Sequence, residues 1–535
     1  MAKDSRLKLS LLAAVLLAAA VRVPALVAAW PYSHYVDEGH VMLVVMRLVR
    51  DGGWDPAWYT YPSLPLYAIA LPARLLAPLY GWLRGEALAD AVPPLRVYEL
   101  LEPPELLLFG RLLTLLASLA IVVLAGLLAR RLAGDLAGGL AALAAALVPA
   151  LVIRGGIVIV DTWAALFILA CLLLTDRLVT SPRPTAAAAA LAGAMGGLAL
   201  ASKYTGGLVA VAFVVVVLLA PFPFRRKLLL LAAGGAGALL AAVAAMPALV
   251  LRPAGVRAAW QWLGVWYGGP QASVRFWPQA VRYAEWDQPL AAPELGWPFL
   301  LLAAAGLVVA LADRHLARRV VGWAVYGAAF VGLAARFPFQ PFRNLLPLVA
   351  PAAVLAALAL ARLVGRLPGP RRAWSAAVAL ALIFVLGPPA VQYAQGRWQA
   401  RDSRTEALAW LAPRLRPGDR VLVSEELAVL PSELRRLPAR VRVAPWPAAR
   451  EALRSGKYRF YLGGALRLDG WRPPGPHARE RVARRYEVRA VFGESITYAH
   501  TGLFSGNRRR VDVWEVRPPG RQGASGLRRD EGRVR

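Results

Sequence analysis

Long apolar runs alternate with short polar loops along roughly the first three quarters of the chain. Runs of about 17–24 apolar residues are long enough to cross the roughly 30 Å hydrocarbon layer of a membrane as helices. The pattern therefore predicts a mainly α-helical, polytopic membrane protein with about eleven transmembrane helices. These runs are 9–30, 107–129, 137–153, 157–176, 185–201, 205–222, 228–250, 296–312, 320–335, 345–361 and 373–391.

Two further segments between the first and second runs do not fit a crossing. Three prolines interrupt 64–83, and Arg74 lies in its middle, features that disfavour a regular span. A crossing there would also invert the sidedness of every later loop. The segment 40–50 carries Arg47 and Arg50 on one face, as interfacial helices do. We expect both segments to lie as helices at the outer membrane surface.

The distribution of basic residues predicts which loops face the cytoplasm. Arginine-rich loops alternate with loops rich in Trp, Tyr and Pro, and positive loops mark the cytoplasmic side. This places the N-terminus inside and the chain after about residue 392 outside. The first run, 9–30, follows a short basic start but is long for a signal-peptide core, so we interpret it as an uncleaved span. The basic loops lie at 130–131, 177–183, 225–227, 314–319 and 362–372.

The pattern changes after about residue 394. Short strand-like runs replace the long apolar runs, and helix-like pieces such as 404–415 lie between them. We predict a transmembrane domain over 1–394, a small α/β extracytoplasmic domain over 395–517 and a disordered basic tail over 518–535. The strand-like runs are 420–424, 440–443, 458–462, 486–492 and 510–516.

Composition agrees with a membrane protein and excludes two other classes. Hydrophobic residues make up 58% of the 535 residues, whereas soluble proteins have about 45–50%. The formal charge of +30 does not indicate nucleic-acid binding, because most of the excess arginine lies in short loops between apolar runs. The single cysteine, Cys171, lies within an apolar run and offers neither an internal disulfide nor a metal cluster.

A few polar and ionisable residues lie near the predicted outer face within reach of the bilayer. Ionisable groups at this depth are costly and usually face a cavity or a partner. Acids of this kind can take a proton from an attacking hydroxyl, and basic residues can hold a phosphate as it leaves. The set predicts a site that moves a group off a lipid-linked phosphate. Its members are Asp37, Glu38, Arg154, Asp161, Lys203, Tyr204 and Arg343.

Each of these residues also has a structural interpretation. The acids at 37–38 could cap the following helix, because negative charge favours helix N-termini. Asp161 could pair with Arg154 simply to stabilise the fold. Lys203 and Arg343 could extend toward lipid head groups.

Histidines flank the two acids but do not predict a metal site. His34 and His40 lack the spacing of metal ligands, so we expect His34, together with Tyr61, to line a substrate cavity instead. The chain contains no P-loop, GxGxxG, HExxH or paired CxxC motif. Nucleotide-driven transport and zinc-dependent hydrolysis therefore have no motif support.

Five short pieces of the sequence, in order, resemble the C-type integral-membrane glycosyltransferases. Residues 8–390 are similar to glycosyltransferase family 39, which includes protein O-mannosyltransferases and aminoarabinose transferases of lipid A. The pieces are the Asp-Glu pair with "YPSLPLY" (61–67), "GRLLTLLASL" (110–119), R-x6-D (154–161), "LALASKY" (198–204) and "FRNLLPLVAP" (342–351).

The resemblance implies an inverting transferase that uses a polyprenyl-phosphate-linked sugar on the non-cytoplasmic face. It implies Asp37 as the acceptor-activating base with Glu38 beside it, and Asp161 as the second acid. It needs no cofactor, although the two aspartates together would suit a divalent cation. The residues that it assigns to the donor phosphate are Arg154, Lys203, Tyr204 and Arg343.

Two departures from the family pattern stand out. Family members often have two adjacent prolines after His or Lys, where this chain has Tyr61-Pro62-Ser63. A cation that would bind the lipid phosphate is therefore missing there. Asn344 stands where an aromatic residue is usual.

We therefore expect a multi-pass plasma-membrane enzyme that transfers a sugar from a polyprenyl-phosphate donor to a protein, lipid or glycan hydroxyl. A transporter or flippase of lipid-linked sugars is the alternative, although the chain shows no internal repeat of the kind that transporters carry. A third alternative is an inert membrane scaffold whose outer domain binds a partner. The acids at 37 and 161 argue against it.

Overall fold

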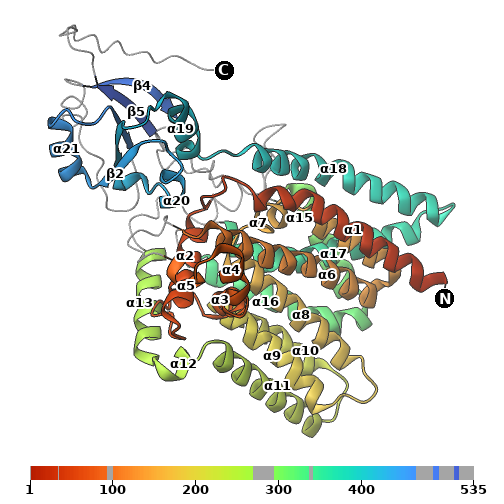
Figure 1. Cartoon of the computed structure of the whole chain (residues 1–535). Helices are drawn as coiled ribbons and strands as arrows, with labels where there is room; N and C mark the ends of the chain where they lie inside the picture. The colour runs from red at the N-terminus through yellow and green to blue at the C-terminus, as the bar shows by residue number, and fades with distance from the viewer. Residues whose placement is uncertain are drawn as a thin grey trace. The chain divides into compact units, whose positions relative to one another are not determined.

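The computed structural model describes residues 2–33, 35–92, 101–268, 295–336, 342–464, 486–492 and 511–516. The chain folds as two compact units that divide between Ala400 and Arg401 (Figure 1). The first unit consists of helices, and the second contains the sheet. The predicted tail and His34 lie outside the described residues.

The first unit contains long apolar helices and several shorter ones (Figure 1). The long helices are α1 (Ala2–Leu26), α6 (Pro104–Leu147), α8 (Val160–Val179), α9 (Ala186–Ser202), α10 (Val209–Leu219), α11 (Phe224–Ala245), α15 (Trp297–Ala312), α16 (Arg314–Ala334), α17 (Leu346–Arg366) and α18 (Arg371–Gln399). The others are α2 (Val36–Asp51), α3 (Leu64–Leu75), α4 (Ala77–Arg84), α5 (Leu88–Ala91), α7 (Pro149–Arg154), α12 (Ala248–Leu251), α13 (Pro253–Gly268) and the 3₁₀ helices η1 (Tyr204–Leu208) and η2 (Phe342–Leu345).

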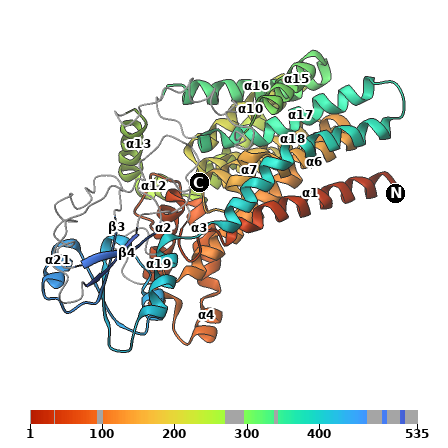
Figure 2. The ribbon, with the colours of Figure 1, turned by 90° about the horizontal axis from the view of Figure 1, so that it is seen from above.

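Small residues allow these helices to pack closely. Figure 2 shows α1, α6, α17 and α18 side by side, and their alanines and leucines share one large core. Between α9 and α11, a Cβ atom at Gly193 would collide with the carbonyl oxygen of Gly234, and one at Gly197 would collide with Ala238. Close backbone approach of this kind is typical of helices that associate within a bilayer.

Within the described ranges, seven helices are long and apolar enough to cross a membrane, or eight if the bent pair α3 and α4 is one span. One of the seven, α6, is two helices joined at a kink, where Gly134 adopts a φ of 84°. Three further apolar helices, α9, α15 and η1 with α10, are shorter. The multi-pass helical architecture is therefore present, and the count of eleven spans stays a prediction.

The segment 64–83, predicted as one surface helix, is instead two helices. α3 and α4 meet at Leu76 with a bend of 53°. Pro78 occupies the first turn of α4, where the missing N–H costs nothing, and it cannot continue the preceding helix. The proline thus fixes the position of the break. Helix α2 covers the predicted segment 40–50 and begins four residues earlier.

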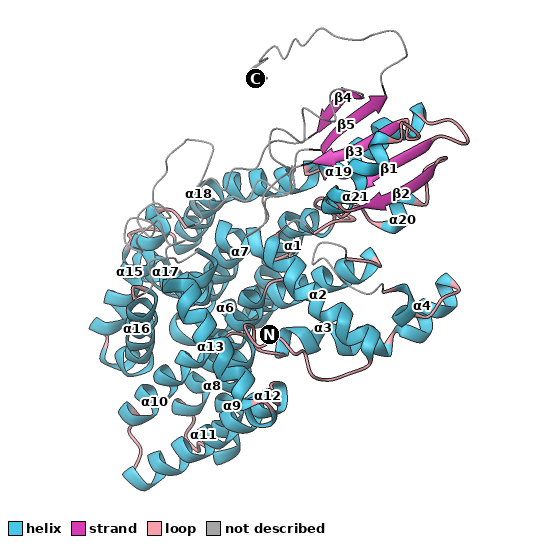
Figure 3. Cartoon of the chain, turned by 90° about the vertical axis from the view of Figure 1, so that its left-hand side faces the viewer, coloured by secondary structure: helices cyan, strands magenta, loops and turns pink. Residues whose placement is uncertain are grey.

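The second unit contains a five-stranded sheet with the order β2-β1-β3-β5-β4 (Figure 3). β1 pairs in parallel with β2 and β3, and β5 pairs antiparallel with β3 and β4. Alternate residues of the strands pack on α19 (Ser403–Leu411) and on α21 (Trp446–Arg454), one on each face. All five strands coincide with the strand-like runs of the sequence: β1 (Arg420–Ser424), β2 (Arg440–Ala444), β3 (Phe460–Gly464), β4 (Tyr486–Phe492) and β5 (Val511–Val516).

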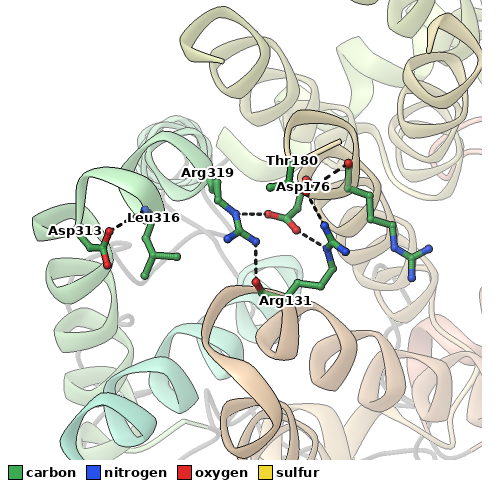
Figure 4. A network of polar contacts seen from close by, with 7 residues as sticks. Arg131, Asp176, Thr180, Asp313, Leu316 and Arg319 are labelled. Carbon is green, nitrogen blue, oxygen red and sulfur yellow. Dashed lines mark hydrogen bonds and ion pairs between the residues drawn. The ribbon is translucent and has the colours of Figure 1, made fainter. Parts of the chain in front are cut away.

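The buried carboxylate of Asp176, in the last turn of α8, accepts bonds from two other helices (Figure 4). Each oxygen of Asp176 accepts a 2.6 Å bond from an arginine Nε, one from Arg131 of α6 and one from Arg319 of α16. Arg131 also donates to the Thr180 hydroxyl at 2.6 Å. Both arginines belong to loops or helix ends that the sequence places on the cytoplasmic side.

Candidate active site

The two adjacent acids at the start of α2 face different neighbours. Asp37 and Glu38 occupy the first turn of α2, where the helix dipole favours negative charge. Consecutive residues of a helix point about 100° apart, because the helix has 3.6 residues per turn. One carboxylate consequently faces the protein core, and the other lies beside a cavity.

Glu38 is fully buried and its carboxylate holds three chain segments together. Arg111 of α6 donates to both oxygens, at 2.9 and 2.7 Å, and the Val158 backbone N–H donates at 3.0 Å. Arg111 also donates to the carbonyl oxygens of Leu26 and Ala28. The carboxylate of Glu38 is thus enclosed by the fold, and its predicted catalytic role stays a prediction.

Arg111 is a residue of the site region that sequence reasoning did not select. It lies in the apolar run 107–129, and a lone arginine within such a run was the available signal. The partner could not be read from the sequence, because Glu38 and Arg111 are 73 residues apart.

Asp37 has partners on two sides, and one of them, Tyr61, lines the cavity described below. It forms an ion pair with Arg343 of η2, and both side chains are 15% exposed. Its Oδ1 accepts a hydrogen bond of 3.1 Å from the Tyr61 hydroxyl. Its Oδ2 is the oxygen that pairs with the Arg343 guanidinium. Each oxygen of this carboxylate therefore has one partner among the described residues.

The Tyr61 hydroxyl can act only as a neutral donor toward Asp37. Burial raises the pKa of the Tyr61 phenol well above its usual range, and the nearby Asp37 carboxylate raises it further. The hydroxyl therefore keeps its proton at neutral pH. Tyr61 also lines the cavity described below, and its contact with a substrate stays a prediction.

A second ion pair joins Asp161 and Lys203. Asp161 is buried in the first turn of α8, and Lys203 is the extended residue that ends α9. The Lys203 ammonium also donates at 2.6 Å to the Oδ1 atom of Asn344. Asn344 is thus a member of the site that the sequence marked only as a departure from the family pattern.

The short helix η2 connects the two ion pairs. Its consecutive residues Arg343 and Asn344 contact Asp37 and Lys203, respectively. Arg343 additionally donates at 2.8 Å to the hydroxyl of Tyr35. The structure thereby joins residues from four separate parts of the sequence into one polar network.

A cavity of about 520 Å³ lies against this network. Its polar wall includes Tyr61, Lys203, Tyr204 and Asn344, and much of the remainder is apolar. The apolar part comes largely from α13 and α16 and includes Trp260, Leu263, Phe330, Leu333 and Ala334. A pocket with an apolar body and a few convergent polar groups is the usual form of a small-molecule site.

Two threonines in the cavity wall have buried hydroxyls without a hydrogen-bond partner among the described residues. They are Thr60 and Thr205, whose Oγ1 atoms find no acceptor or donor there. An unsatisfied buried hydroxyl is unfavourable by about 1–3 kcal/mol. A ligand that offers hydrogen-bonding groups would remove this cost.

The remaining predicted site residues lie around this centre. Arg154 ends α7 and is 5% exposed, and its backbone oxygen accepts a 3.2 Å bond from the Thr162 hydroxyl. The Tyr204 hydroxyl donates at 2.6 Å to the carbonyl oxygen of Tyr59. Its ring packs edge-on against Trp260 at 5.4 Å between centroids. Tyr204 lines the cavity, and the phosphate-binding roles of Arg154 and Tyr204 stay predictions.

The described residues do not form a metal site. They contain no group of three or more His, Cys, Asp or Glu side chains that could hold a metal ion. The two aspartates that would suit a divalent cation each pair with a basic side chain instead: Asp37 with Arg343, and Asp161 with Lys203.

One segment of the chain matches a known family. Residues 107–251 match the model of the dolichyl-phosphate-mannose-protein mannosyltransferase family. This segment contains Arg111, Asp161 and Lys203, whereas Asp37 and Arg343 lie outside it. No protein of curated function is significantly similar to the chain in sequence.

The fold is similar to that of solved membrane glycosyltransferases. ArnT from Cupriavidus metallidurans in the apo state is 15% identical with a TM-score of 0.54, and the match covers 96% of this chain and 98% of ArnT. The ArnT structure bound to undecaprenyl phosphate is 16% identical with a TM-score of 0.53, covering 94% and 98%. The Archaeoglobus fulgidus oligosaccharyltransferase in complex with Zn and sulfate is 13% identical with a TM-score of 0.48, covering 85% and 68%.

The segment match and the fold together confirm the predicted resemblance: the chain has the GT-C fold of integral-membrane glycosyltransferases.

Proposed function

We propose that this GT-C protein transfers a sugar from a polyprenyl-phosphate donor to a hydroxyl acceptor on the extracytoplasmic side of the plasma membrane, with inversion at the anomeric carbon. One observation carries the proposal. The Lys203 ammonium lies in the wall of a cavity whose body is largely apolar, and the Asp37–Arg343 ion pair adjoins this wall at Tyr61 and Asn344.

The cavity suits the phosphate end of an isoprenoid lipid. Its apolar walls on α13 and α16 would contact the first isoprene units, and the Lys203 ammonium would contact the phosphate. The undecaprenyl phosphate complex of ArnT, which shares this fold, supports a ligand of this class. The unpartnered hydroxyls of Thr60 and Thr205 suit a donor with polar groups.

Asp37 would act as the base for the acceptor. Its Oδ2 takes the proton of the acceptor hydroxyl as that oxygen attacks the anomeric carbon. The bond between this carbon and the phosphate oxygen breaks at the same time, and its electron pair goes to the phosphate. Attack from the face opposite the leaving phosphate inverts the configuration of the carbon.

The basic residues would stabilise the leaving phosphate. Charge develops on the phosphate oxygen in the transition state, and Arg343 of η2 and Lys203, which contacts η2 at Asn344, would stabilise it. Tyr61 positions Asp37 through its hydrogen bond, and the Glu38–Arg111 pair holds the start of α2. The second unit would lie on the extracytoplasmic side of the membrane.

Sugar transfer in reconstituted membranes tests this proposal. The purified chain is given a panel of radiolabelled polyprenyl-phosphate sugars with protein, lipid and glycan acceptors, and the anomeric configuration of the product is read by NMR. Asp37→Asn keeps the shape of the side chain but removes the base, and we expect transfer to fall by about 10²–10⁴-fold.

Asp51→Asn is the matched control. Asp51 lies at the other end of α2 and is exposed. Among the described residues, its ion-pair partner is the adjacent Arg50. Full transfer by Asp51→Asn together with loss in a folded Asp37→Asn protein would support the proposal. Equal transfer by both variants would overturn the role of Asp37. Movement of lipid-linked sugar across the bilayer without any transfer would favour a flippase instead.

A further inference from the structure

Asn344 accepts a hydrogen bond from a lysine that already has an ion-pair partner. Its Oδ1 accepts a 2.6 Å hydrogen bond from Lys203, although Lys203 already has an ion-pair partner in Asp161. The orientation of the amide follows from chemistry, because an ammonium group can only donate. Asn344 is also 7% exposed and belongs to the wall of the cavity.

From this geometry we infer that Asn344 is a positioning residue: its neutral oxygen holds the Lys203 ammonium toward the cavity for a phosphate, without cancelling the positive charge. The inference rests on the proposed function and adds a residue that determines donor affinity. An ammonium has three donor protons, and Asp161 and Asn344 engage two of them. The third is available to a ligand in the cavity.

The charge balance of the site explains why an amide suits this position. Asp161 neutralises Lys203, and Asp37 neutralises Arg343, so the two pairs together carry no net charge. A second carboxylate at position 344 would make the cavity wall negative and would repel a phosphate. An apolar residue would leave Lys203 free to turn fully toward Asp161. An amide avoids both effects.

The backbone on both sides is built to present this contact. Lys203 ends α9 in an extended conformation, with φ −152° and ψ 133°, and the chain turns at once into η1. On the other side, η2 places Arg343 and Asn344 in succession, so that one short helix contacts both ion pairs. A shift of Asn344 would therefore move the Lys203 ammonium, which is the group proposed to bind the donor phosphate.

Two variants of similar shape separate positioning from a merely structural role. Asn344→Asp keeps an oxygen at the same place but adds a negative charge, and Asn344→Leu keeps the volume but removes the acceptor. The readouts are thermal stability and the affinity for undecaprenyl phosphate, measured with the full chain in nanodiscs. The KM for donor and acceptor are measured in parallel.

We expect Asn344→Asp to keep or raise the Tm, because its carboxylate pairs with Lys203, and to weaken undecaprenyl phosphate binding by at least about tenfold. Asn344→Leu should weaken binding by about tenfold. Both should raise the donor KM and leave the acceptor KM unchanged. Gln261→Glu is the control, because it makes the same amide-to-acid change on an exposed position of α13, and it should bind as the wild type does.

Three results would overturn the inference. The first is a Tm that falls in Asn344→Leu while both variants bind undecaprenyl phosphate normally, which would make Asn344 purely structural. The second is an equal loss of binding in Gln261→Glu, which would make the effect one of general charge. The third is a wild-type chain that binds no undecaprenyl phosphate, and this result would overturn the proposed function as well.

Discussion

The two ends of helix α8 carry the same kind of interaction and differ in what surrounds it. At the last turn, both oxygens of Asp176 are bound by arginines from two other helices. At the first turn, Asp161 pairs with Lys203, whose ammonium reaches on to Asn344 in a cavity wall. Burial and an ion pair alone therefore do not identify a functional acid. The adjacent cavity and an available donor proton do.

The same contrast separates the two adjacent acids of α2. Glu38 is fully buried and is bound by Arg111 and a backbone N–H, whereas Asp37 is 15% exposed and is bound by Arg343 and by Tyr61, a residue of the cavity wall. We expect the fully enclosed carboxylate to stabilise the fold. We expect the partly exposed one, next to the cavity wall, to be open to a substrate.

The largest expected effect is a loss of folding stability, and it comes from the ion pairs of Asp176 at the last turn of α8. Asp176→Asn leaves Arg131 and Arg319 without their shared anion, and breaking a buried ion pair costs about 3–5 kcal/mol. Thermal unfolding in detergent should show a clearly lower Tm. The transfer rate per folded molecule should stay at the wild-type level. A lower rate in the folded fraction would contradict the division between the two ends.

Asp161→Asn should reduce sugar transfer more than it reduces thermal stability. The amide can still accept a bond from Lys203 but no longer supplies the charge that holds the ammonium beside the cavity. We expect transfer to fall by about 10²-fold, in the range seen when one charge-stabilising group is removed. The Tm should change less than it does in Asp176→Asn. A fall in Tm as large as that of Asp176→Asn, with an unchanged transfer rate per folded molecule, would make both ends structural.

Tyr61→Phe removes a single hydrogen bond to the proposed base. The Asp37 carboxylate loses its 3.1 Å donor, and hydrogen bonds to charged groups are worth about 1.5–3 kcal/mol. Steady-state kinetics should show kcat reduced by about tenfold with an unchanged donor KM. An unchanged kcat would exclude Tyr61 from positioning Asp37.

The smallest effect is expected from the two cavity threonines. Thr60→Val and Thr205→Val each remove a hydroxyl that has no partner among the described residues, so the Tm should stay the same or rise slightly. Undecaprenyl phosphate binding in nanodiscs should weaken about two- to fivefold if the donor bonds these hydroxyls. Thr175→Val is the control, because its hydroxyl already bonds the Cys171 carbonyl at 2.7 Å. Normal binding by all three variants would remove the threonines from the donor site.

The fold was largely predictable from the sequence because its signals are local. Apolar runs of helical length marked the helices, and all five short strand-like runs of the second unit became strands. The break between α3 and α4 was missed, because prolines indicate an interruption without fixing how many helices result. The kink of α6 at Gly134 shows how one long helix can correspond to two predicted spans.

The site was predictable as a set of charges but not as a set of pairs. Asp37, Asp161, Lys203 and Arg343 stood out because ionisable groups are rare in apolar surroundings. Their pairing depends on contacts between residues more than 40 positions apart, as the 42 residues between Asp161 and Lys203 show. Asn344 was seen only as a departure, because an uncharged side chain gives no comparable signal.

The central claim is tested most directly by the affinity for undecaprenyl phosphate. This affinity is measured for the wild type, for Lys203→Gln and for Arg131→Gln. Lys203→Gln removes the basic partner of Asp161 at the first turn of α8, and Arg131→Gln removes one basic partner of Asp176 at its last turn. In nanodiscs, we predict that Lys203→Gln binds at least about tenfold more weakly, as expected for a lost bond to a charged group. Arg131→Gln should bind as the wild type does. Equal affinity of Lys203→Gln and the wild type would contradict the account.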